Sequence, residues 1–394
     1  MKVKNLFFAT MLGLFSTLGY AGIKALPDMQ DRHIIVFHHE VSQLRSVEIV
    51  NEIRKGKGVI KHQYQTALKG LAVTMPLPAL QAISKTYPEI AWIEPDLVVF
   101  ALPKGGKPDR GGSDEESYID TDNGTEVTPW GVHRLGGTKE PLSDAKAWIL
   151  DTGIDVNHRD LNVVTKQGEQ LLSRSFIEGQ SELIDGDGHG THVAGTVGAK
   201  ANNLDVVGVA PGAAVVPIKV LSDSGSGSLS GVIAAIDYVA AQASPGDCAN
   251  LSLGAQGSSL AMDTALKNAA TSGVVFSIAA GNSGADIARY TPAQVQYDHV
   301  FTIAAVDNRD APPRWSNYHT SASVSAVGNA TFVEYALPGV SVISTKAGGG
   351  TVTYSGTSMA APHFCGLIVS GYNPVAVGKD ISTRKKQYGV IPSL

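Results

Sequence analysis

Near the start of the chain, the spacing of apolar positions alternates between that of strands and that of amphipathic helices, which predicts a small α+β domain. Between residues 31 and 102, they indicate a strand, an amphipathic helix, two strands, a short helix before Pro88 and a last strand around Ile93. The apolar face of the first helix is formed by Val41, Leu44, Val47, Val50 and Ile53. The order βαββαβ is that of the ferredoxin-like arrangement. We therefore expect a small ferredoxin-like α+β domain within residues 22–102.

A second pattern begins at Ala147, where apolar runs alternate with helical segments. The runs are residues 147–151, 214–221, 249–254 and 274–282, and the helical segments are residues 229–243 and 259–272. Such alternation is typical of βαβ units, and it predicts an α/β domain over residues 129–375 with a parallel β-sheet sandwiched by helices. Asp151, Gly254 and Asn282 end three of the runs, at the sheet edge where open α/β folds place their sites.

The N-terminal segment, residues 1–21, has the layout of a secretory signal peptide. Lys2 and Lys4 precede an apolar run from Leu6 to Phe15, and small residues follow up to Ala21. We expect cleavage after Ala21 and secretion of the protein. A membrane anchor is the alternative, but the run is far shorter than the ~20 residues that span a bilayer.

Two further segments are polar. Residues 103–128 are rich in Gly, Pro, Asp, Glu and Ser and lack the apolar content of a core, which predicts a flexible linker. Because proteolysis concentrates in exposed linkers, we expect a maturation cut between Ala101 and Thr128, with the mature chain starting near Trp130. Residues 376–394 are predicted to form a polar C-terminal tail.

Composition narrows the range of partners. The 394 residues include 43% hydrophobic and 17% charged positions and carry a net charge of -5, so no basic field favours nucleic acid or an anionic membrane. Polypeptide substrates stay possible, and a monomer is the default. The only two cysteines are Cys248 and Cys365. Both lie in apolar surroundings, and we favour two buried free thiols over a single bridge.

Three catalytic residue types occur in glycine-rich surroundings. Asp151 lies in ILDTGID, His189 in GHGTHVAGT and Ser358 in SGTSMAAPH. Acyl transfer from a peptide needs a nucleophile, a base beside it, and a third group that fixes the tautomer of the base. Serine, histidine and aspartate fit these roles in turn. The combination indicates a serine peptidase.

Each motif by itself has a plainer interpretation. Ser358 alone would be an N-cap serine. His189 and His192 have a spacing that also suits a metal pair, but no HExxH motif accompanies them. The DTG at Asp151 also occurs in aspartic peptidases, which need a second Asp motif that the chain lacks. Asp155, the competing carboxylate, is expected to be a capping or surface group.

Together, the motifs resemble those of the subtilisin-like serine peptidases (subtilases), with features of the proteinase K branch. The resemblance covers residues 130–366, and the segment before it resembles the inhibitory propeptide of that family. Subtilisin has the same chain order of Asp, His and Ser. The resemblance implies that Ser358 is the nucleophile, His189 the base and Asp151 the group that orients the base, while His192 is structural.

The resemblance also implies residues for the oxyanion and the substrate. Asn282 would donate to the oxyanion together with the backbone N–H of Ser358. The substrate backbone would add as a strand to Gly225, Ser226 and Gly227. The primary pocket would be lined by Ser252, Leu253, Gly254, Ala279, Ala280 and Gly281. Because neither pocket segment contains an acidic residue, we expect apolar or aromatic residues, rather than Arg or Lys, before the cleaved bond.

Calcium is the cofactor that the resemblance implies. Asp160 matches a carboxylate ligand of one family calcium site, with residues 201–205 as its companion loop. Glu334 stands near a second site, with carbonyl ligands expected around Asp298 and Val300. Hard oxygen ligands of this kind suit Ca²⁺. A solvated surface group is an equal alternative for each carboxylate.

These expectations describe a secreted serine endopeptidase that is made as a self-processing zymogen, with its own propeptide as folding assistant and inhibitor. The rival interpretation is a non-enzymatic, propeptide-trapped protein, because less chain follows Ser358 than is usual in the family.

Overall fold

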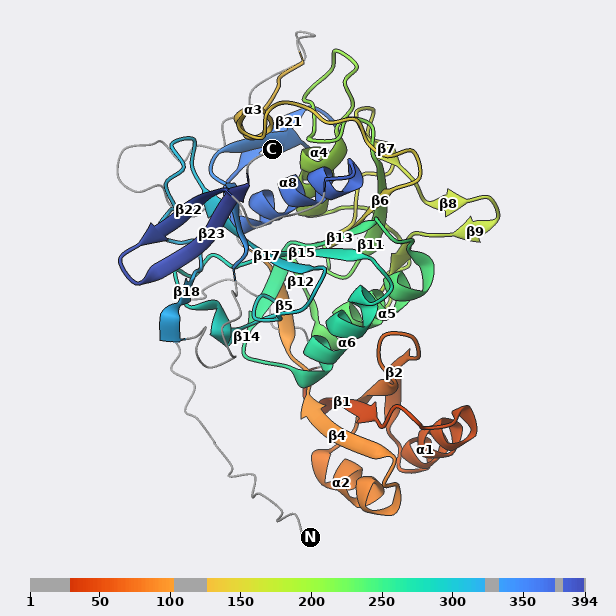
Figure 1. Cartoon of the computed structure of the whole chain (residues 1–394). Coiled ribbons are helices and arrows are strands. Elements are labelled where there is room, and N and C mark those ends of the chain that lie inside the picture. The colour runs from red at the N-terminus through yellow and green to blue at the C-terminus, as the bar shows by residue number, and fades with distance from the viewer. Residues whose placement is uncertain (1–28, 103–125, 323–332, 373–377, 393–394) are drawn as a thin grey trace.

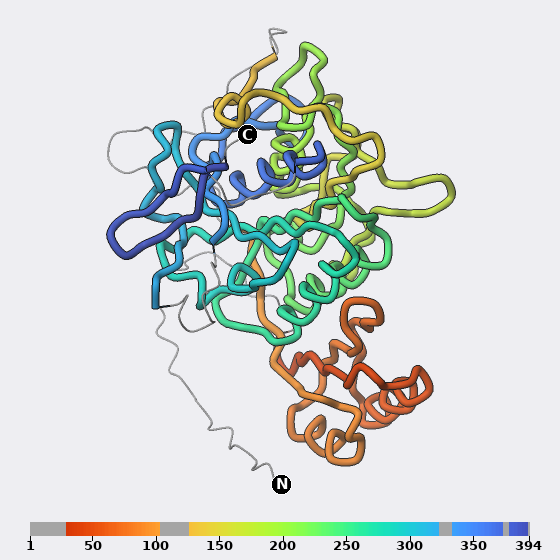
Figure 2. The backbone as a smooth tube through the Cα atoms, in the orientation of Figure 1, coloured from red at the N-terminus to blue at the C-terminus, as the bar shows by residue number. Residues whose placement is uncertain are grey.

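The computed structural model describes residues 29–102, 126–322, 333–372 and 378–392 (Figure 1). The chain forms two units, a small N-terminal unit of residues 29–97 and a large unit that begins at residue 126. Figure 2 shows that a single stretch of chain leads from the small unit into the body of the large one. This stretch contains β5 (Val98–Ala101), which belongs to a sheet of the large unit. The predicted signal peptide and most of the predicted linker lie outside the described residues.

The N-terminal unit has the predicted βαββαβ order. Its elements are β1 (Arg32–Phe37), α1 (Gln43–Lys55), β2 (Val59–Tyr64), β3 (Gly70–Thr74), α2 (Leu77–Thr86) and β4 (Ile90–Pro95). The antiparallel sheet has the order β2-β3-β1-β4. Ile35, Phe37, Ile49, Ile53 and Leu80 form its core, between the sheet and the two helices. The predicted ferredoxin-like α+β arrangement is confirmed.

The large unit is built on a parallel sheet, as predicted. Its central strands run in the order β11 (Ala214–Lys219), β6 (Lys146–Asp151), β13 (Cys248–Leu251), β15 (Val275–Ala279), β17 (Val300–Val306) and β19 (Tyr335–Pro338). Short strands continue one edge: β10 (Arg174–Ser175) and β7 (Asn162–Val163) both pair with β11. Smaller elements are α3 (Trp130–Arg134), β8 (Lys166–Gln167), β9 (Gln170–Leu171), η1 (Ile287–Arg289), β20 (Val342–Thr345) and β21 (Thr351–Tyr354).

Successive side chains of β6 are buried on opposite faces of this sheet. Ala147 and Ile149 pack in the cluster that contains α4 (His189–Gly198) and α8 (Thr357–Val369). Trp148 and Leu150 point the other way, into the cluster formed by α5 (Leu229–Gln242) and α6 (Leu260–Ala270). Because successive strand residues face opposite sides, a strand that is apolar throughout requires helices on both faces. The helices of the two layers appear above and below the sheet in Figure 1.

The expectation of two free thiols is wrong. Cys248 of β13 and Cys365 of α8 form a disulfide, with Cα atoms 5.5 Å apart. Helix α8 packs directly on β13, which brings the two residues within the Cα range of a disulfide. The sequence separation of 117 residues gives no sign of this contact. The bridge ties α8 to the middle of the sheet.

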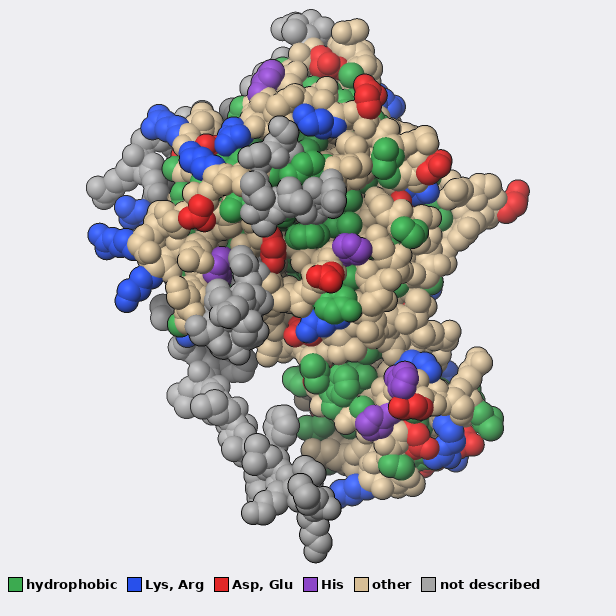
Figure 3. Space-filling model, viewed as in Figure 1, with side chains coloured by type: hydrophobic (Ala, Val, Ile, Leu, Met, Phe, Trp, Pro, Cys, Tyr) green, Lys and Arg blue, Asp and Glu red, His purple; other side chains and the backbone are tan. Residues whose placement is uncertain are grey.

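The C-terminal segment is a β-hairpin and not the predicted polar tail. Strand β22 (Gly378–Thr383) pairs with β23 (Lys386–Pro392), and β23 joins the sheet beside β19 and β18 (His319–Thr320). Ile381, Tyr388 and Ile391 are buried against the sheet, and these few apolar positions were too sparse to indicate two strands. Basic side chains gather on the outer side of the hairpin (Figure 3), which carries Lys379, Arg384, Lys385 and Lys386. Among the described residues, no helix has the length and apolar character needed to cross a membrane.

Candidate active site

Asp151 and His189 are brought together by the ends of two elements. Asp151 is the last residue of β6 and His189 the first of α4, and both are fully buried. The Nδ1 atom of His189 lies 2.7 Å from Oδ1 of Asp151, which also accepts the N–H of Thr152. With Nδ1–H donated to a carboxylate, the neutral ring takes up protons at Nε2. The geometry is that of an oriented general base.

Ser358 is the second residue of α8, on the same side of the sheet as α4. Its Oγ donates to the carbonyl oxygen of Ser252 at 3.2 Å, and Ser252 Oγ in turn donates to the carbonyl oxygen of Ser358 at 2.9 Å. This exchange joins the start of α8 to the segment that follows β13. The N-terminus of α8 also places partial positive charge beside the Ser358 hydroxyl.

Asn282 follows β15 and faces the start of α8. Its Oδ1 accepts two hydrogen bonds from Thr357, from the N–H at 2.9 Å and from Oγ1 at 2.8 Å. Because Oδ1 of the amide accepts these two hydrogen bonds, the Nδ2 group of Asn282 points away from Thr357 and can serve as a hydrogen-bond donor. Asn282 thus bonds to Thr357, the residue before Ser358, and its role as oxyanion donor stays a prediction.

Two buried polar residues that the sequence analysis missed hold these loops. Asn317 accepts the N–H groups of Ser283 and Ala285 at Oδ1 and donates from Nδ2 to Ala280 O, so it fixes the loop around Asn282. Asp185 accepts Oγ1–H of Thr152 at 2.7 Å, and it also accepts from the backbone N–H of Gly188 and from Thr191. Asp185 thereby fastens the turn before His189 to the residue after Asp151.

Strand β5 of the N-terminal side occupies the predicted substrate segments. It lies between β12 (Ser226–Ser228) and β14 (Leu253–Gln256), antiparallel to both, and β16 (Tyr290–Thr291) completes this small sheet. Ala101 N–H donates to Gly225 O at 2.8 Å, and Leu102 N–H points to Ser252 O at 3.5 Å. Figure 1 shows β5 inserted between the two strands.

All six residues predicted on the two edges of the cleft lie beside this inserted strand. Gly227 pairs with Val99, while Gly254 pairs with Phe100. The Leu102 side chain lies near Gly254, because a Cβ added to this glycine would lie 3.9 Å from Leu102 Cδ2. The other pocket segment, residues 279–281, follows β15 directly, and Leu102 packs on the buried cluster that includes Ala279.

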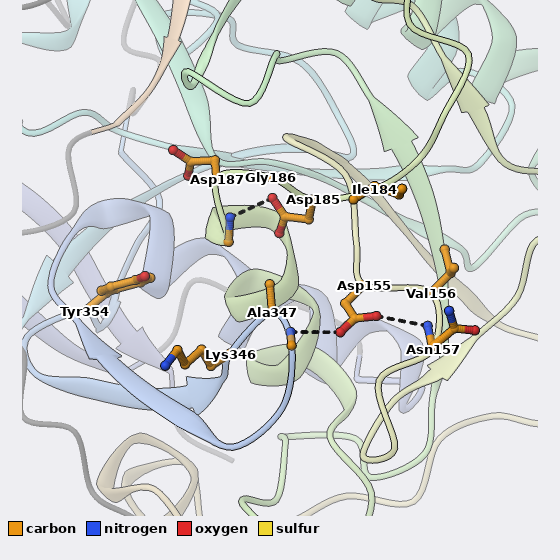
Figure 4. A pocket seen from close by; sticks show the side chains of 12 residues that line it. Asp155, Val156, Asn157, Ile184, Asp185, Gly186, Asp187, Lys346, Ala347 and Tyr354 are labelled. Carbon is orange, nitrogen blue, oxygen red and sulfur yellow. Dashed lines mark hydrogen bonds between the residues drawn. The ribbon is translucent and has the colours of Figure 1, made fainter.

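The two further residues named in the sequence motifs have structural roles. His192 is buried, and its Nε2 lies 3.0 Å from Val342 O while its ring stacks on Tyr354. Asp155 accepts the N–H groups of Asn157 at 3.1 Å and Gly348 at 2.9 Å, so it caps turns, as Figure 4 shows. Within the described ranges, no group of three or more His, Cys, Asp or Glu side chains is arranged to hold a metal.

The two carboxylates predicted as calcium ligands differ in exposure and in their partners: Asp160 is fully buried and Glu334 is half-buried. Asp160 Oδ2 accepts the Val206 N–H at 3.3 Å, and Oδ1 has no hydrogen-bond partner among the described residues. Burial, with a smaller contribution from the nearby Asp205 carboxylate, raises the pKa of Asp160 to about 7. Asp205 itself is paired with Arg159.

Glu334, by contrast, is satisfied by protein groups. Its Oε2 accepts the Thr302 N–H at 2.7 Å, and burial raises the pKa of this carboxyl well above its usual range. Asp298 and Val300 line a cavity of about 1030 Å³ together with Glu334, and the expected binding of calcium by their carbonyl oxygens stays a prediction.

Comparison with known proteins agrees with this geometry. The sequence model described as the Subtilase family matches residues 145–372. Subtilisin DY of Bacillus licheniformis is 41% identical over 258 residues, which cover 63% of this chain and 86% of that protein. Proteinase R of Parengyodontium album is 29% identical over 360 residues, covering 88% of this chain and 80% of that protein.

A longer relative and a solved structure are also similar. Alkaline serine exoprotease A of Vibrio alginolyticus is 38% identical over 248 residues, and the match covers 60% of this chain but only 42% of that protein. The crystal structure of a cold adapted subtilisin-like serine proteinase superposes with a TM-score of 0.53 at 32% identity, covering 68% of this chain and 100% of that one.

Proposed function

The chain belongs to the subtilase family, and we propose that it is a secreted endopeptidase that hydrolyses polypeptides through an acyl-enzyme on Ser358. The proposal is supported by three features: the hydrogen bond that orients His189 on Asp151, the Ser358 hydroxyl at a helix N-terminus, and an extended strand that ends beside Ser252, to which Ser358 is bonded. Secretion is proposed from the signal-like residues 1–21.

Each residue has a definite task in the proposed reaction. His189 takes the hydroxyl proton as Ser358 Oγ attacks the carbonyl carbon, and it returns that proton to the departing amine. Asp151 keeps Nδ1–H of the ring bound and stabilises the imidazolium. The Asn282 side chain and the Ser358 N–H would donate to the oxyanion of the tetrahedral intermediate. Water then attacks the acyl group by the reverse sequence.

We further propose that the N-terminal unit is an inhibitory propeptide. Three carboxylates support its docking on the large unit. Glu94 accepts from Ser259 Oγ and from Ala261 N–H at the start of α6, and Asp96 accepts the Ser230 N–H at the start of α5. Acidic groups are favoured at helix N-termini. The third carboxylate, Asp237 of the large unit, accepts backbone N–H groups of the N-terminal unit.

The residue that fills the cleft supports an apolar primary specificity. Leu102 stands where the residue before the cleaved bond would lie, because its N–H points to Ser252 O beside the nucleophile. Its side chain meets Gly254 and the cluster around Ala279, and the two pocket segments hold no charged side chain. We expect substrates with apolar or aromatic residues at this position to be cleaved fastest.

Calcium binding is proposed at Asp160 and not at Glu334. A buried carboxylate oxygen without a partner is costly, and a hard cation would satisfy it. Glu126 Oε2 contacts the predicted companion loop of residues 201–205, where it accepts the N–H groups of Asn202 and Asn203. Glu334 fits a cation less well because the Thr302 N–H already occupies Oε2. When bound, the ion would tie the companion loop to Asp160.

The proposed function is tested by expressing the chain from Gly22 in wild-type form and as Ser358→Ala. Mass and casein hydrolysis are followed over time, with and without calcium. We expect self-cleavage between Ala101 and Thr128 and loss of casein in the wild type only. An intact, inert wild type, or equal casein loss in both chains, would contradict the proposal.

A further inference from the structure

A buried lysine stands beside the Asp151–His189 pair and takes no part in the proton transfers of the proposed reaction. Lys219 is the last residue of β11, and its side chain is only 2% exposed. In the parallel pairing of β11 with β6, it lies opposite Asp151. Lysine is almost never fully buried unless its ammonium is paired. The partners of this ammonium therefore indicate its role.

The Lys219 ammonium connects three loops. Its Nζ donates to the carbonyl oxygens of Thr152 and of Ile184, the latter at 3.1 Å, and to Asp223 Oδ1 at 2.8 Å. An ammonium has three N–H donors, so each of them has an acceptor here. The three acceptors lie directly after Asp151, in the loop before α4 and in the loop before β12. One charged group thus joins three loops at the edge of the sheet.

Two of these loops carry the groups that orient the imidazole. Thr152 donates its N–H to Asp151 Oδ1 and its hydroxyl to Asp185, both at 2.7 Å. Asp185 follows Ile184 in the chain (Figure 4), and it also accepts the N–H of the residue before His189 at 2.8 Å. The ammonium thus fixes the backbone on both sides of the Asp151–His189 hydrogen bond.

Asp223 balances the buried charge. Its carboxylate is about half exposed and also accepts the Gly186 N–H at 3.3 Å. The hydrogen bond from Lys219 lowers the pKa of Asp223, so this carboxylate stays ionised at neutral pH. Because the two opposite charges are 2.8 Å apart, their effects on more distant groups largely cancel. Lys219 therefore acts mainly through the positions in which its three hydrogen bonds hold the loops.

We propose that Lys219 is a positioning residue for the base: its ammonium holds the backbone beside Asp151 and before His189, and so keeps the imidazole where it can take the Ser358 proton. The inference rests on the proposed function and adds to it a residue that acts through its neighbours and not on the reacting atoms. Precise placement of this kind matters, because a misplacement of about 1 Å can cost about 100-fold in rate.

The test compares kcat and KM of Lys219→Met with those of the wild type on a peptide amide. Full chains are cut in the linker by an added cysteine protease, which is then inhibited, and activity is read after dilution has released the N-terminal unit. Methionine keeps an apolar stem and removes the three donors. We expect kcat to fall by about 100-fold, while KM changes by less than about twofold, because substrate contacts are kept.

Two comparisons separate positioning from stability. Lys139→Met is the matched control, because Lys139 Nζ also donates to three backbone carbonyls, those of residues 135–137, and it should keep the wild-type kcat. In a His189→Ala background no base is left to position, so Lys219→Met should cause no further loss of kcat. If Lys219→Met does not fold, Lys219→Gln takes its place, since its amide can still donate to one carbonyl.

A folded Lys219→Met or Lys219→Gln with the wild-type kcat overturns the inference. An equal loss of kcat with and without His189 overturns it as well, because the lysine would then act on something other than the base. Failure of the proposed function would look different, since the wild type would then cleave the peptide no faster than Ser358→Ala.

Discussion

Replacing Asp237 with alanine should loosen the N-terminal unit from the large unit. Asp237 lies on α5, and its carboxylate receives four backbone N–H groups from one loop of the N-terminal unit. The donors are Gln65 to Oδ2 at 3.0 Å, and Thr66, Ala67 and Leu68 to Oδ1 at 2.7, 2.7 and 3.3 Å. Ala67 and Leu68 are almost fully buried, so water cannot readily replace the lost acceptor for these two.

The magnitude follows from those two buried donors. Leaving a buried donor unsatisfied costs about 1–3 kcal/mol, so a loss of about 3 kcal/mol in docking free energy is expected for the pair. The exposed Gln65 and Thr66 donors add little, because water takes over their hydrogen bonds. Since 1.4 kcal/mol is a factor of ten, release of the N-terminal unit should accelerate by roughly 100-fold.

The assay measures release from chains whose linker has been cut by an added protease. The nicked complex is diluted, and the appearance of peptidase activity gives the release rate. Asp237→Asn keeps one acceptor oxygen and should give an intermediate rate. Gln242→Ala, on the same helix but bonded to Gln170 within the large unit, should behave as the wild type. A change of less than threefold in Asp237→Ala would refute the reasoning.

Three further predictions concern turnover, pH and stability. Asn282→Ala should lower kcat about 100- to 1,000-fold with little change in KM, the range known for such a donor in subtilisin itself; a loss below tenfold would remove Asn282 from the oxyanion role. Burial, then the Arg32 charge, lowers the pKa of His62 to about 4 from its ordinary 6.5, so docking is strongest above pH 6.5 and weakens as the pH falls toward 4. Lys61, Arg174 and Glu178 also act on this ring, and release at pH 5 should be up to about 30-fold faster than at pH 7.5, with the dependence lost in His62→Gln. Replacing Cys248 and Cys365 together with alanine should destabilise the large unit by about 2–5 kcal/mol, seen as a lower Tm; an unchanged Tm would show that the bridge contributes nothing.

The hydrophobic pattern was sufficient for the order of elements in the N-terminal unit and for β6, β11, β13 and β15 of the large sheet, but it did not indicate β17 or β19. It works for β6 because every residue from Ala147 to Leu150 is apolar and buried, which only a strand covered on both faces explains. It failed at the C-terminal hairpin, where the large buried side chains Ile381, Tyr388 and Ile391 are too few to indicate two strands and Ile381 lies among Lys, Asp, Ser and Thr.

The catalytic motifs were visible because each is a contiguous string, whereas the groups that hold them are scattered. Asp185 and Asn317 are single polar residues whose partners are backbone N–H groups of distant loops. No spacing rule predicts such contacts, because they depend on where the loops lie after folding. The disulfide and the Asp237 anchor were missed for the same reason.

The way the chain enters the large unit bears on how activation must proceed. In the uncut chain, Val127 pairs with Val206 and Glu126 bonds the loop near Asp160, while Leu102 lies beside Ser252. Residues 103–125 connect these two places and, at up to about 3.6 Å per residue, are long enough to join any two points of the unit. A cut within them therefore moves neither end. With the inhibitory role proposed above, the cut changes the N-terminal unit from a tethered inhibitor, at an effective concentration of about millimolar, into one at its bulk concentration, so that dilution and destruction of the released piece would govern the onset of activity.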